Sequence, residues 1–160
     1  MMGAGKSSVG RALADRSGRV FQDTDLLLQN RLGRSIPQMF VRYGEEAFRD
    51  HETSLLRSLE PGASVLATGG GIVCREENWN ELRRLGATIY LRAMPETLLE
   101  RLGQSKKKRP LLEADDWEVR LRTLLDNRLP LYSQADIAVD VDGHSIDEVA
   151  AAVLEKIDHL

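Results

Sequence analysis

Three consecutive residues near the start of the chain, Gly5, Lys6 and Ser7, have the types and the order of a phosphate-binding loop. In the pattern G-x-x-x-x-G-K-[ST], backbone N–H groups surround the phosphates, the lysine reaches the terminal ones and the hydroxyl binds Mg²⁺. The first glycine of that pattern would fall one residue before Met1. By itself, this fragment is equally compatible with a chance turn before a helix.

Three further groups of residues could take part in chemistry, and the first two of them follow short β-rich runs. Asp23 and Asp25 can bind a metal or a substrate, or can cap the helix that follows them. The glycines at 69–71 permit either a tight turn or the close approach of a ligand to the backbone. The basic run Lys106 to Arg109 is typical of a solvated loop when no other signal accompanies it. Each cluster therefore leaves a structural alternative open.

Length and charge limit the class of protein. A chain of 160 residues forms one ordinary domain, and its net charge of −3 gives no long-range attraction to nucleic acid or to an anionic membrane. No apolar run is long enough to span a bilayer. Cys74 is the only cysteine, which excludes an internal disulfide, fits a reducing compartment and, in an apolar run, predicts a buried thiol. We expect a cytoplasmic monomer.

The elements that must position these clusters alternate between β-rich runs and longer helical patterns. Helices are expected from the loop to residue 17, over 26–32, 35–44, 45–59, 79–85, 95–102 and 117–127, and from 145 onward. Strands are expected at residues 19–23, 64–67, 87–92 and 136–141. This order indicates an α/β fold, a three-layer α/β/α sandwich around a parallel sheet. Because ligands bind beyond the carboxyl ends of such strands, the phosphate loop, the aspartates and the glycines should meet there.

The motifs have an order that spans nearly the whole chain: GAGKSSVG, FQDTD, GEEAFRDHE, VLATGGGIV, KRPLL and NRLPLY. Together they resemble the shikimate kinase family, whose members have the P-loop kinase fold of the nucleoside monophosphate kinase type. The phosphate loop and the glycine triplet occur in many kinases. The D-x-D after the strand, F-R-x-x-E and R-x-x-x-Y are specific to this family.

The resemblance implies transfer of the γ-phosphoryl group of ATP to the 3-hydroxyl of shikimate, on the route to chorismate and the aromatic amino acids. Arg49 and Arg128 match the family's carboxylate-binding arginines, whose forked guanidinium groups suit an acid. Asp25 matches the aspartate that binds the reacting hydroxyl and can accept its proton. Gly70 matches a backbone contact to the substrate, where a missing Cβ lets the six-membered ring approach.

The resemblance also implies a nucleotide site with Mg²⁺ as the cofactor of ATP. Lys6 should neutralise the β- and γ-phosphates, and Arg109 matches a lid arginine that closes on them, so both join Asp25 as expected catalytic residues. Ser7 should bind Mg²⁺. Asp23 should either contact the ion through water or hold Asp25 in place. The loop residues expected at the nucleotide are Gly3, Ala4, Gly5, Lys6, Ser7 and Ser8.

Within a single domain of residues 1–160, substrate-binding helices are expected at about 24–60 and a lid at about 104–116, poorly ordered without ligand. The segment VDVDGHSIDE falls where the family's adenine-binding loop lies, and members often place an arginine there. His144 is the nearest candidate in this chain. It can stack on adenine or be structurally idle, and we expect the idle role.

The family's first strand, which lies at the centre of its sheet, has no counterpart within residues 1–160. Loss of a central strand would cost more than the roughly 5–15 kcal/mol that stabilises a domain. We therefore expect about ten mostly apolar residues to precede Met1 in the full protein, so that Met1 or Met2 is an internal residue of the loop.

Three alternative functions remain open at this point. One is a related P-loop kinase that acts on gluconate or a nucleotide, although Asp25, Arg49 and Arg128 favour a hydroxylated carboxylic acid. Another is a nucleotide- or metabolite-binding module without catalysis, which the incomplete phosphate loop would explain. The last is a non-functional fragment of a longer gene.

Overall fold

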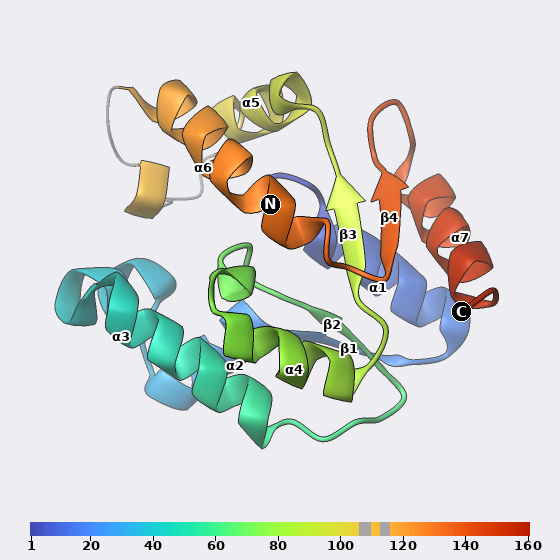
Figure 1. Ribbon diagram of the computed structural model, residues 1–160, viewed down its shortest axis with the longest axis horizontal. Coiled ribbons are helices and arrows are strands. Elements are labelled where there is room, and N and C mark those ends of the chain that lie inside the picture. Colours follow the sequence, from blue (N-terminus) through green and yellow to red (C-terminus); the bar gives the residue numbers. More distant parts are fainter. Residues whose placement is uncertain (106–109, 113–115) are drawn as a thin grey trace.

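The computed structural model describes residues 1–105, 110–112 and 116–160. In these ranges, helices alternate with short parallel strands (Figure 1), which confirms the predicted α/β class. None of the helices in these ranges is long and apolar enough to cross a membrane. The elements, with η for a 3₁₀ turn, are α1 (Lys6–Ser17), β1 (Val20–Asp23), α2 (Thr24–Leu32), α3 (Ile36–Ser58), β2 (Ser64–Ala67), η1 (Ile72–Cys74), α4 (Glu76–Leu85), β3 (Ile89–Arg92), α5 (Pro95–Gly103), η2 (Pro110–Leu112), α6 (Trp117–Tyr132), β4 (Ile137–Asp140) and α7 (Ile146–Ile157).

Local signals in the sequence set most of the helix ends. Gly18 and Gly33 end α1 and α2, as the sequence predicts. Ser145 begins α7 through a capping box with Glu148. Inside α3, Gly44 has φ 81° and ψ 173°, a conformation outside the helical region. The two helices predicted on either side of this glycine therefore meet at a kink.

Helix α6 is longer than the sequence predicts. The expectation that it ends at Asn127 is wrong, because it continues through Pro130 to Tyr132. A proline removes one backbone hydrogen bond and disfavours helix in the residue before it. Tyr132 offsets this cost, since it is buried and stacks on Tyr90 of β3. The extra turn places Arg128 and Tyr132 one turn apart on the same side of α6.

The four strands of the described chain form two separate pairs. β1 runs parallel to β2, with Val20 opposite Ser64, and β3 runs parallel to β4, with Ile89 opposite Ile137. Within the described ranges no strand lies between β2 and β3, so the single sheet expected from the sequence is split here. Paired strands must lie about 4.7–4.9 Å apart. Instead, the inner edges of β2 and β3 border a cavity of about 420 Å³.

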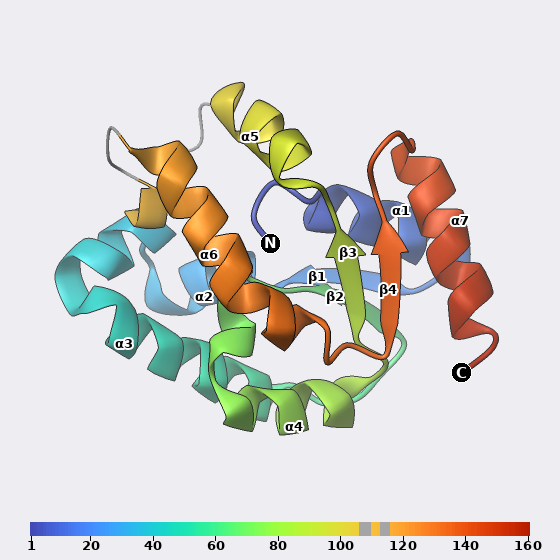
Figure 2. The ribbon, with the colours of Figure 1, turned by 45° about the horizontal axis from the view of Figure 1, so that its top comes forward.

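Helices cover both sides of the strands (Figures 1 and 2). α1 and α7 pack together on one side, where Leu13 and Val153 are buried. α4 lies on the other side and buries Trp79. Leu13, Trp79 and Leu154 all line the cavity between the strand pairs. The cavity is therefore lined by apolar side chains from the helices on both faces and is bordered by the backbone edges of β2 and β3.

Helices α2 and α3 enclose a second, smaller core. It is formed by Leu28, Met39, Phe48 and Leu55. α2 follows β1 without a loop, because Asp23 is both the last residue of the strand and the cap of the helix. This small unit therefore starts at the carboxyl end of a strand, where ligands bind in parallel α/β folds.

The η1 turn connects the glycines after β2 to α4. Ile72 and Val73 are buried but Cys74 is exposed, so the predicted buried thiol is wrong. The turn directs its first two side chains into the core and its third to solvent. Asn78 of α4 is fully buried, and its Nδ2 donates to the carbonyl oxygen of Ile72 at 2.8 Å. This hydrogen bond ties the turn to α4.

We expect Asn78→Ala to lower the free energy of unfolding by about 1–3 kcal/mol, because it leaves the buried Ile72 carbonyl without its donor. Asn80→Ala is the matched control, since Asn80 is exposed on the same helix and its loss should change stability by less than about 0.5 kcal/mol. Urea denaturation measures both. Equal effects of the two substitutions would contradict the structural role of Asn78.

Candidate active site

The phosphate loop turns sharply into α1. Gly5 caps the helix with φ 87° and Gly3 has φ 81°, both in the left-handed region. Ala4 between them is buried, and Nζ of Lys6 donates to the carbonyl oxygen of Met1 at 2.7 Å. The N–H groups at the start of α1 and the lysine side chain therefore lie together, which is the arrangement that binds phosphate at a helix N-terminus.

Ser7 and Asp23 lie in contact, as the prediction of a shared metal site requires. Oγ of Ser7 donates to Oδ2 of Asp23 at 2.7 Å. The other carboxylate oxygen of Asp23 accepts from the backbone N–H of Asp25 at 3.0 Å and from that of Leu26 at 3.4 Å. Asp23 is thus a helix cap and a neighbour of the phosphate loop at once, and the two readings of the sequence are compatible.

The glycines at 69–71 lie directly against charged side chains. A Cβ on Gly69 would lie 2.9 Å from Oε1 of Glu52 and 3.0 Å from Oδ1 of Asp25. A Cβ on Gly71 would lie 2.2 Å from Nη2 of Arg49, so the guanidinium group would have to move away from the two carboxylates that hold it. The triplet is therefore needed because carboxylates and a guanidinium group occupy the space where side chains would project.

Gly70 lies against the backbone of the phosphate loop. A Cβ on Gly70 would meet the backbone N of Met2 at 3.3 Å and the carbonyl carbon of Met1 at 3.4 Å. The backbone of the phosphate loop thus takes up the space on this side of the glycine. This contact places the phosphate loop and the glycine triplet side by side.

Arg49 is a buried arginine on α3. It pairs with Glu52 at 2.5 Å and with Glu45 at 2.8 Å, one turn away on either side. Burial acts to lower the pKa of Arg49, but its two carboxylate partners outweigh burial and raise the pKa. Arg49 therefore stays charged, and its guanidinium group is held next to Gly71.

Glu52 is a site residue that sequence reasoning did not assign. Its side chain is 1% exposed and, within the described residues, Oε1 has no hydrogen-bond partner. Burial raises the pKa of Glu52, Arg49 acts in the opposite direction, and the nearby charge of Asp25 raises it further. The i,i+3 spacing from Arg49 on a helix was the available signal.

Arg128 reaches the same glycines from α6. It is 5% exposed, and its Nη1 donates to the carbonyl oxygen of Gly70 at 3.4 Å. The same carbonyl accepts from the hydroxyl of Tyr132 at 2.6 Å. Arg49 and Arg128 come from distant helices, yet both contact the glycine triplet, as the prediction that one carboxylate binds both would require.

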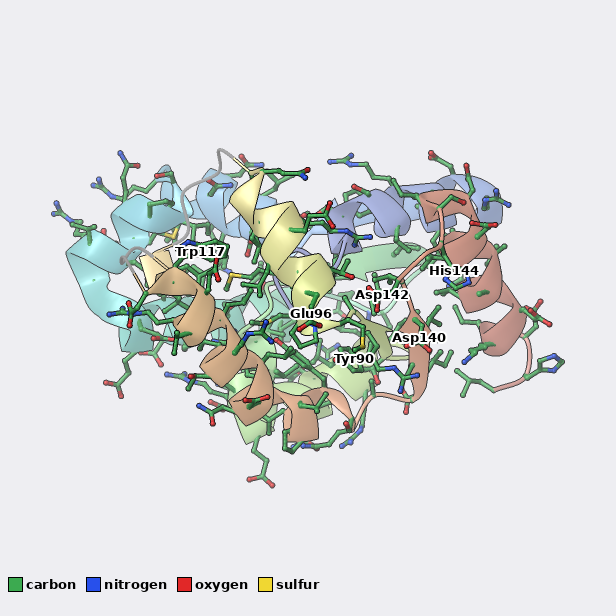
Figure 3. All side chains as sticks on the ribbon, turned by 90° about the horizontal axis from the view of Figure 1, so that it is seen from above. Tyr90, Glu96, Trp117, Asp140, Asp142 and His144 are labelled. Atoms are coloured by element: carbon green, nitrogen blue, oxygen red, sulfur yellow. The ribbon has the colours of Figure 1, made fainter. Side chains whose placement is uncertain are left out.

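A second cavity, of about 320 Å³, adjoins the phosphate loop. Its walls include Gly3, Gly5, Ser8, Arg101, Val141 and His144. Nη1 of Arg101 lies 3.4 Å from the carbonyl oxygen of Gly3, and sequence reasoning gave this arginine no role. His144 lies in the loop between β4 and α7 beside Asp142 (Figure 3), and its Nδ1 is 2.8 Å from the carbonyl oxygen of Asp142. Arg101 lies in the last turn of α5, and no local pattern in the sequence connects it to the phosphate loop.

Part of the predicted nucleotide machinery lies outside the described residues. This applies to Arg109, to the lysines at 106–108 and to residues 113–115 of the predicted lid.

The parallel α/β fold, the phosphate loop at the start of α1 and the Ser7–Asp23 pair define an ATP-dependent kinase of the P-loop class. A scan against protein-family models matches residues 2–158 to the family described as shikimate kinase. The chain belongs to the shikimate kinase family.

Individual relatives agree with this assignment. The chain is 44% identical over 160 residues to shikimate kinase of Symbiobacterium thermophilum, an alignment that covers 98% of this chain and 92% of that protein. It is 38% identical over 160 residues to the enzyme of Thermodesulfovibrio yellowstonii, with 99% and 92% covered.

Solved structures are similar as well. Shikimate kinase from Acinetobacter baumannii, in complex with shikimate, superposes with a TM-score of 0.93 at 38% identity, covering 99% of this chain and 89% of that one. Shikimate kinase from Aquifex aeolicus gives 0.83 at 35% identity, with 99% and 92% covered.

We expect Gly71→Ala to lower the free energy of unfolding by about 1–3 kcal/mol, because the added methyl group collides with the buried guanidinium group of Arg49. Gly62→Ala is the control, since nothing lies within 4 Å of a Cβ there. Thermal denaturation compares the two. If Gly71→Ala were as stable as Gly62→Ala, the close approach of Arg49 would be incorrect.

Tyr132 should produce a measurable pH dependence. Burial raises its pKa from 10.0 to about 12, so its stabilising effect is complete below pH 10 and is lost as the pH rises toward 12. The free energy of unfolding of the wild type relative to Tyr132→Phe should therefore be constant below pH 10 and fall by about 1 kcal/mol between pH 10 and 11. A constant difference up to pH 11 would contradict the burial of the hydroxyl.

Proposed function

We propose that the chain transfers the γ-phosphoryl group of ATP to the 3-hydroxyl of shikimate, which yields shikimate 3-phosphate and ADP on the route to chorismate and the aromatic amino acids. The observation that carries this proposal is the convergence of Asp25, Arg49 and Arg128 on one glycine triplet beside the phosphate loop. Family membership and the shikimate complex of the Acinetobacter baumannii relative support it.

The substrate carboxylate binds Arg49 and Arg128. Each arginine can offer two parallel N–H donors to a carboxylate, and both are nearly buried, which strengthens such hydrogen bonds. The backbone of Gly70 contacts the substrate ring. Arg49 is already paired with Glu52 and Glu45, so the substrate carboxylate adds to or replaces part of that ion pairing.

Asp25 orients the 3-hydroxyl and accepts its proton as the phosphoryl group is transferred. Its position in the first turn of α2, beside Gly69 and close to the charge of Glu52, supports this role. A carboxylate within hydrogen-bond reach of a hydroxyl typically contributes about 10²–10⁴-fold to the rate.

ATP binds at the phosphate loop. Backbone N–H groups of residues 3–8 surround its phosphates, Lys6 neutralises the β- and γ-phosphates, and Arg109 of the lid at about 104–116 closes over them. The cavity between the phosphate loop and His144 provides space for the rest of the nucleotide. The lid excludes water, which would otherwise accept the phosphoryl group.

Mg²⁺ is the expected cofactor, and the residues present fit it. Ser7 and Asp23 together offer a hydroxyl and a carboxylate, the hard oxygen ligands that Mg²⁺ prefers. Within the described residues no group of three or more His, Cys, Asp or Glu side chains could hold a metal alone, so water and phosphate oxygens would complete the shell. When bound, the ion neutralises negative charge on the phosphates.

The protein acts as a cytoplasmic monomer in this proposal. The single domain of residues 1–160 holds the substrate between the helices of residues 24–60 and the glycine triplet. Its site needs no residue from a second copy, because the residues proposed for both substrates come from one chain.

We expect Asp25→Asn to lower kcat by about 10²–10⁴-fold with little change in KM for ATP, because the amide cannot accept the proton of the hydroxyl. Asp126→Asn is the matched control, since Asp126 is exposed on α6. A coupled assay of shikimate-dependent ADP release from Mg·ATP measures both variants.

A wild-type chain that binds ATP but releases no ADP with shikimate would overturn the proposal. Turnover of gluconate or of a nucleotide would then identify another kinase, and binding without any turnover would identify a binding module.

A further inference from the structure

The glycine triplet is held at two of its backbone polar groups by side chains from two different helices. The N–H of Gly69 donates to Oγ1 of Thr24 at 3.0 Å. The carbonyl oxygen of Gly70 accepts from the hydroxyl of Tyr132 at 2.6 Å. One partner comes from the first turn of α2 and the other from the last turn of α6.

Both partners are rigidly placed. Thr24 is fully buried, and Tyr132 is 6% exposed. The ring of Tyr132 stacks on that of Tyr90 in β3, with ring centres 5.1 Å apart and planes 18° apart. A buried hydrogen bond to a fixed side chain restrains the backbone group it binds more than an exposed one does.

Each partner is also the near neighbour of a residue with a proposed chemical role. Thr24 directly precedes Asp25, the proposed base. Tyr132 lies one turn after Arg128, a proposed carboxylate ligand, and both donate to the same carbonyl oxygen. The glycine triplet therefore connects α2, which carries the proposed base Asp25, with α6, which carries Arg128.

This connection fixes a distance that matters to the reaction. A substrate held at its carboxylate presents its hydroxyl at a set distance from that end. Displacement of a base by about 1 Å can cost on the order of 10²-fold in rate. A backbone segment anchored on both sides keeps Asp25 at a constant distance from Arg128 while substrates bind and products leave.

We propose that Thr24 and Tyr132 are positioning residues that hold the glycine triplet between them and thereby set Asp25 at the correct distance from Arg128. This inference rests on the proposed function for its kinetic consequence. Its structural part, the restraint of the triplet by the two side chains, is independent of which substrate binds.

The experiment compares Thr24→Val, Tyr132→Phe and the double variant. Thr24→Val keeps the shape and removes the acceptor of Gly69, so kcat should fall by roughly 5–20-fold with a small change in KM for shikimate. Tyr132→Phe keeps the stacked ring and removes the donor, so KM for shikimate should rise by roughly 5–10-fold, while KM for ATP stays within about twofold. The fold-loss of kcat/KM for shikimate in the double variant should be smaller than the product of the two single-variant losses, because either change already frees the triplet.

Matched controls separate positioning from a general loss of stability. Thr24→Ser keeps the hydroxyl and should recover most of kcat. Tyr90→Phe keeps the stacked ring pair and removes a hydroxyl that does not contact the triplet in the described structure, so its kinetic constants should be those of the wild type. All variants are assayed well below their unfolding temperatures.

Amide hydrogen exchange at Gly69 provides a readout that does not require turnover. Thr24→Val should speed its exchange at least tenfold relative to Thr24→Ser, because the acceptor of that N–H is removed. Unchanged exchange together with unchanged kcat and KM would overturn the inference. Faster exchange in a protein that does not phosphorylate shikimate would leave the restraint intact and overturn only the proposed function.

Discussion

The arrangement of the active site depends on three consecutive residues that have no side chains. Carboxylates from α2 and α3 and the guanidinium group of Arg49 approach residues 69 and 71 so closely that an added methyl group would collide with them. The guanidinium group of Arg128 on α6 donates to the carbonyl oxygen between them. Buried charges are tolerated only when opposite charges or hydrogen bonds compensate them. Here the two carboxylates lie at Gly69 and the guanidinium groups lie at Gly70 and Gly71, while the N–H of Gly69 donates a hydrogen bond and the carbonyl oxygen of Gly70 accepts two.

The buried pair of Arg49 and Glu52 shows how this crowding is tolerated. An isolated buried charge would be very costly, and each member of the pair offsets the other. The raised pKa of Glu52 indicates that burial is compensated incompletely. Part of the free energy of folding is therefore spent on keeping a buried cation in place, which is typical of binding sites and rare in a core built for stability alone.

The sequence was sufficient for the order of the helices and strands, because the glycine end signals, the phosphate loop and the D-x-D cluster all act locally. It failed where long-range packing decides. Tyr132 extends α6 through a proline because of its contact with Tyr90 of β3, and Cys74 faces outward because of the way η1 turns. Thr24 and Arg101 were missed for the same reason, since their partners lie far away in the chain. Glu52 was missed although its partner Arg49 is only three residues away, because this spacing also fits an ordinary ion pair on a helix surface.

The outward-facing thiol of Cys74 gives the molecule a single reactive attachment point near its glycine triplet. Cys74 is the only cysteine in the sequence, and it lies in the η1 turn, three residues after Gly71. An exposed thiol is accessible to alkylating reagents, whereas a buried one is inert. Such a reagent therefore attaches a spectroscopic label at one defined position beside the triplet without any change to the sequence.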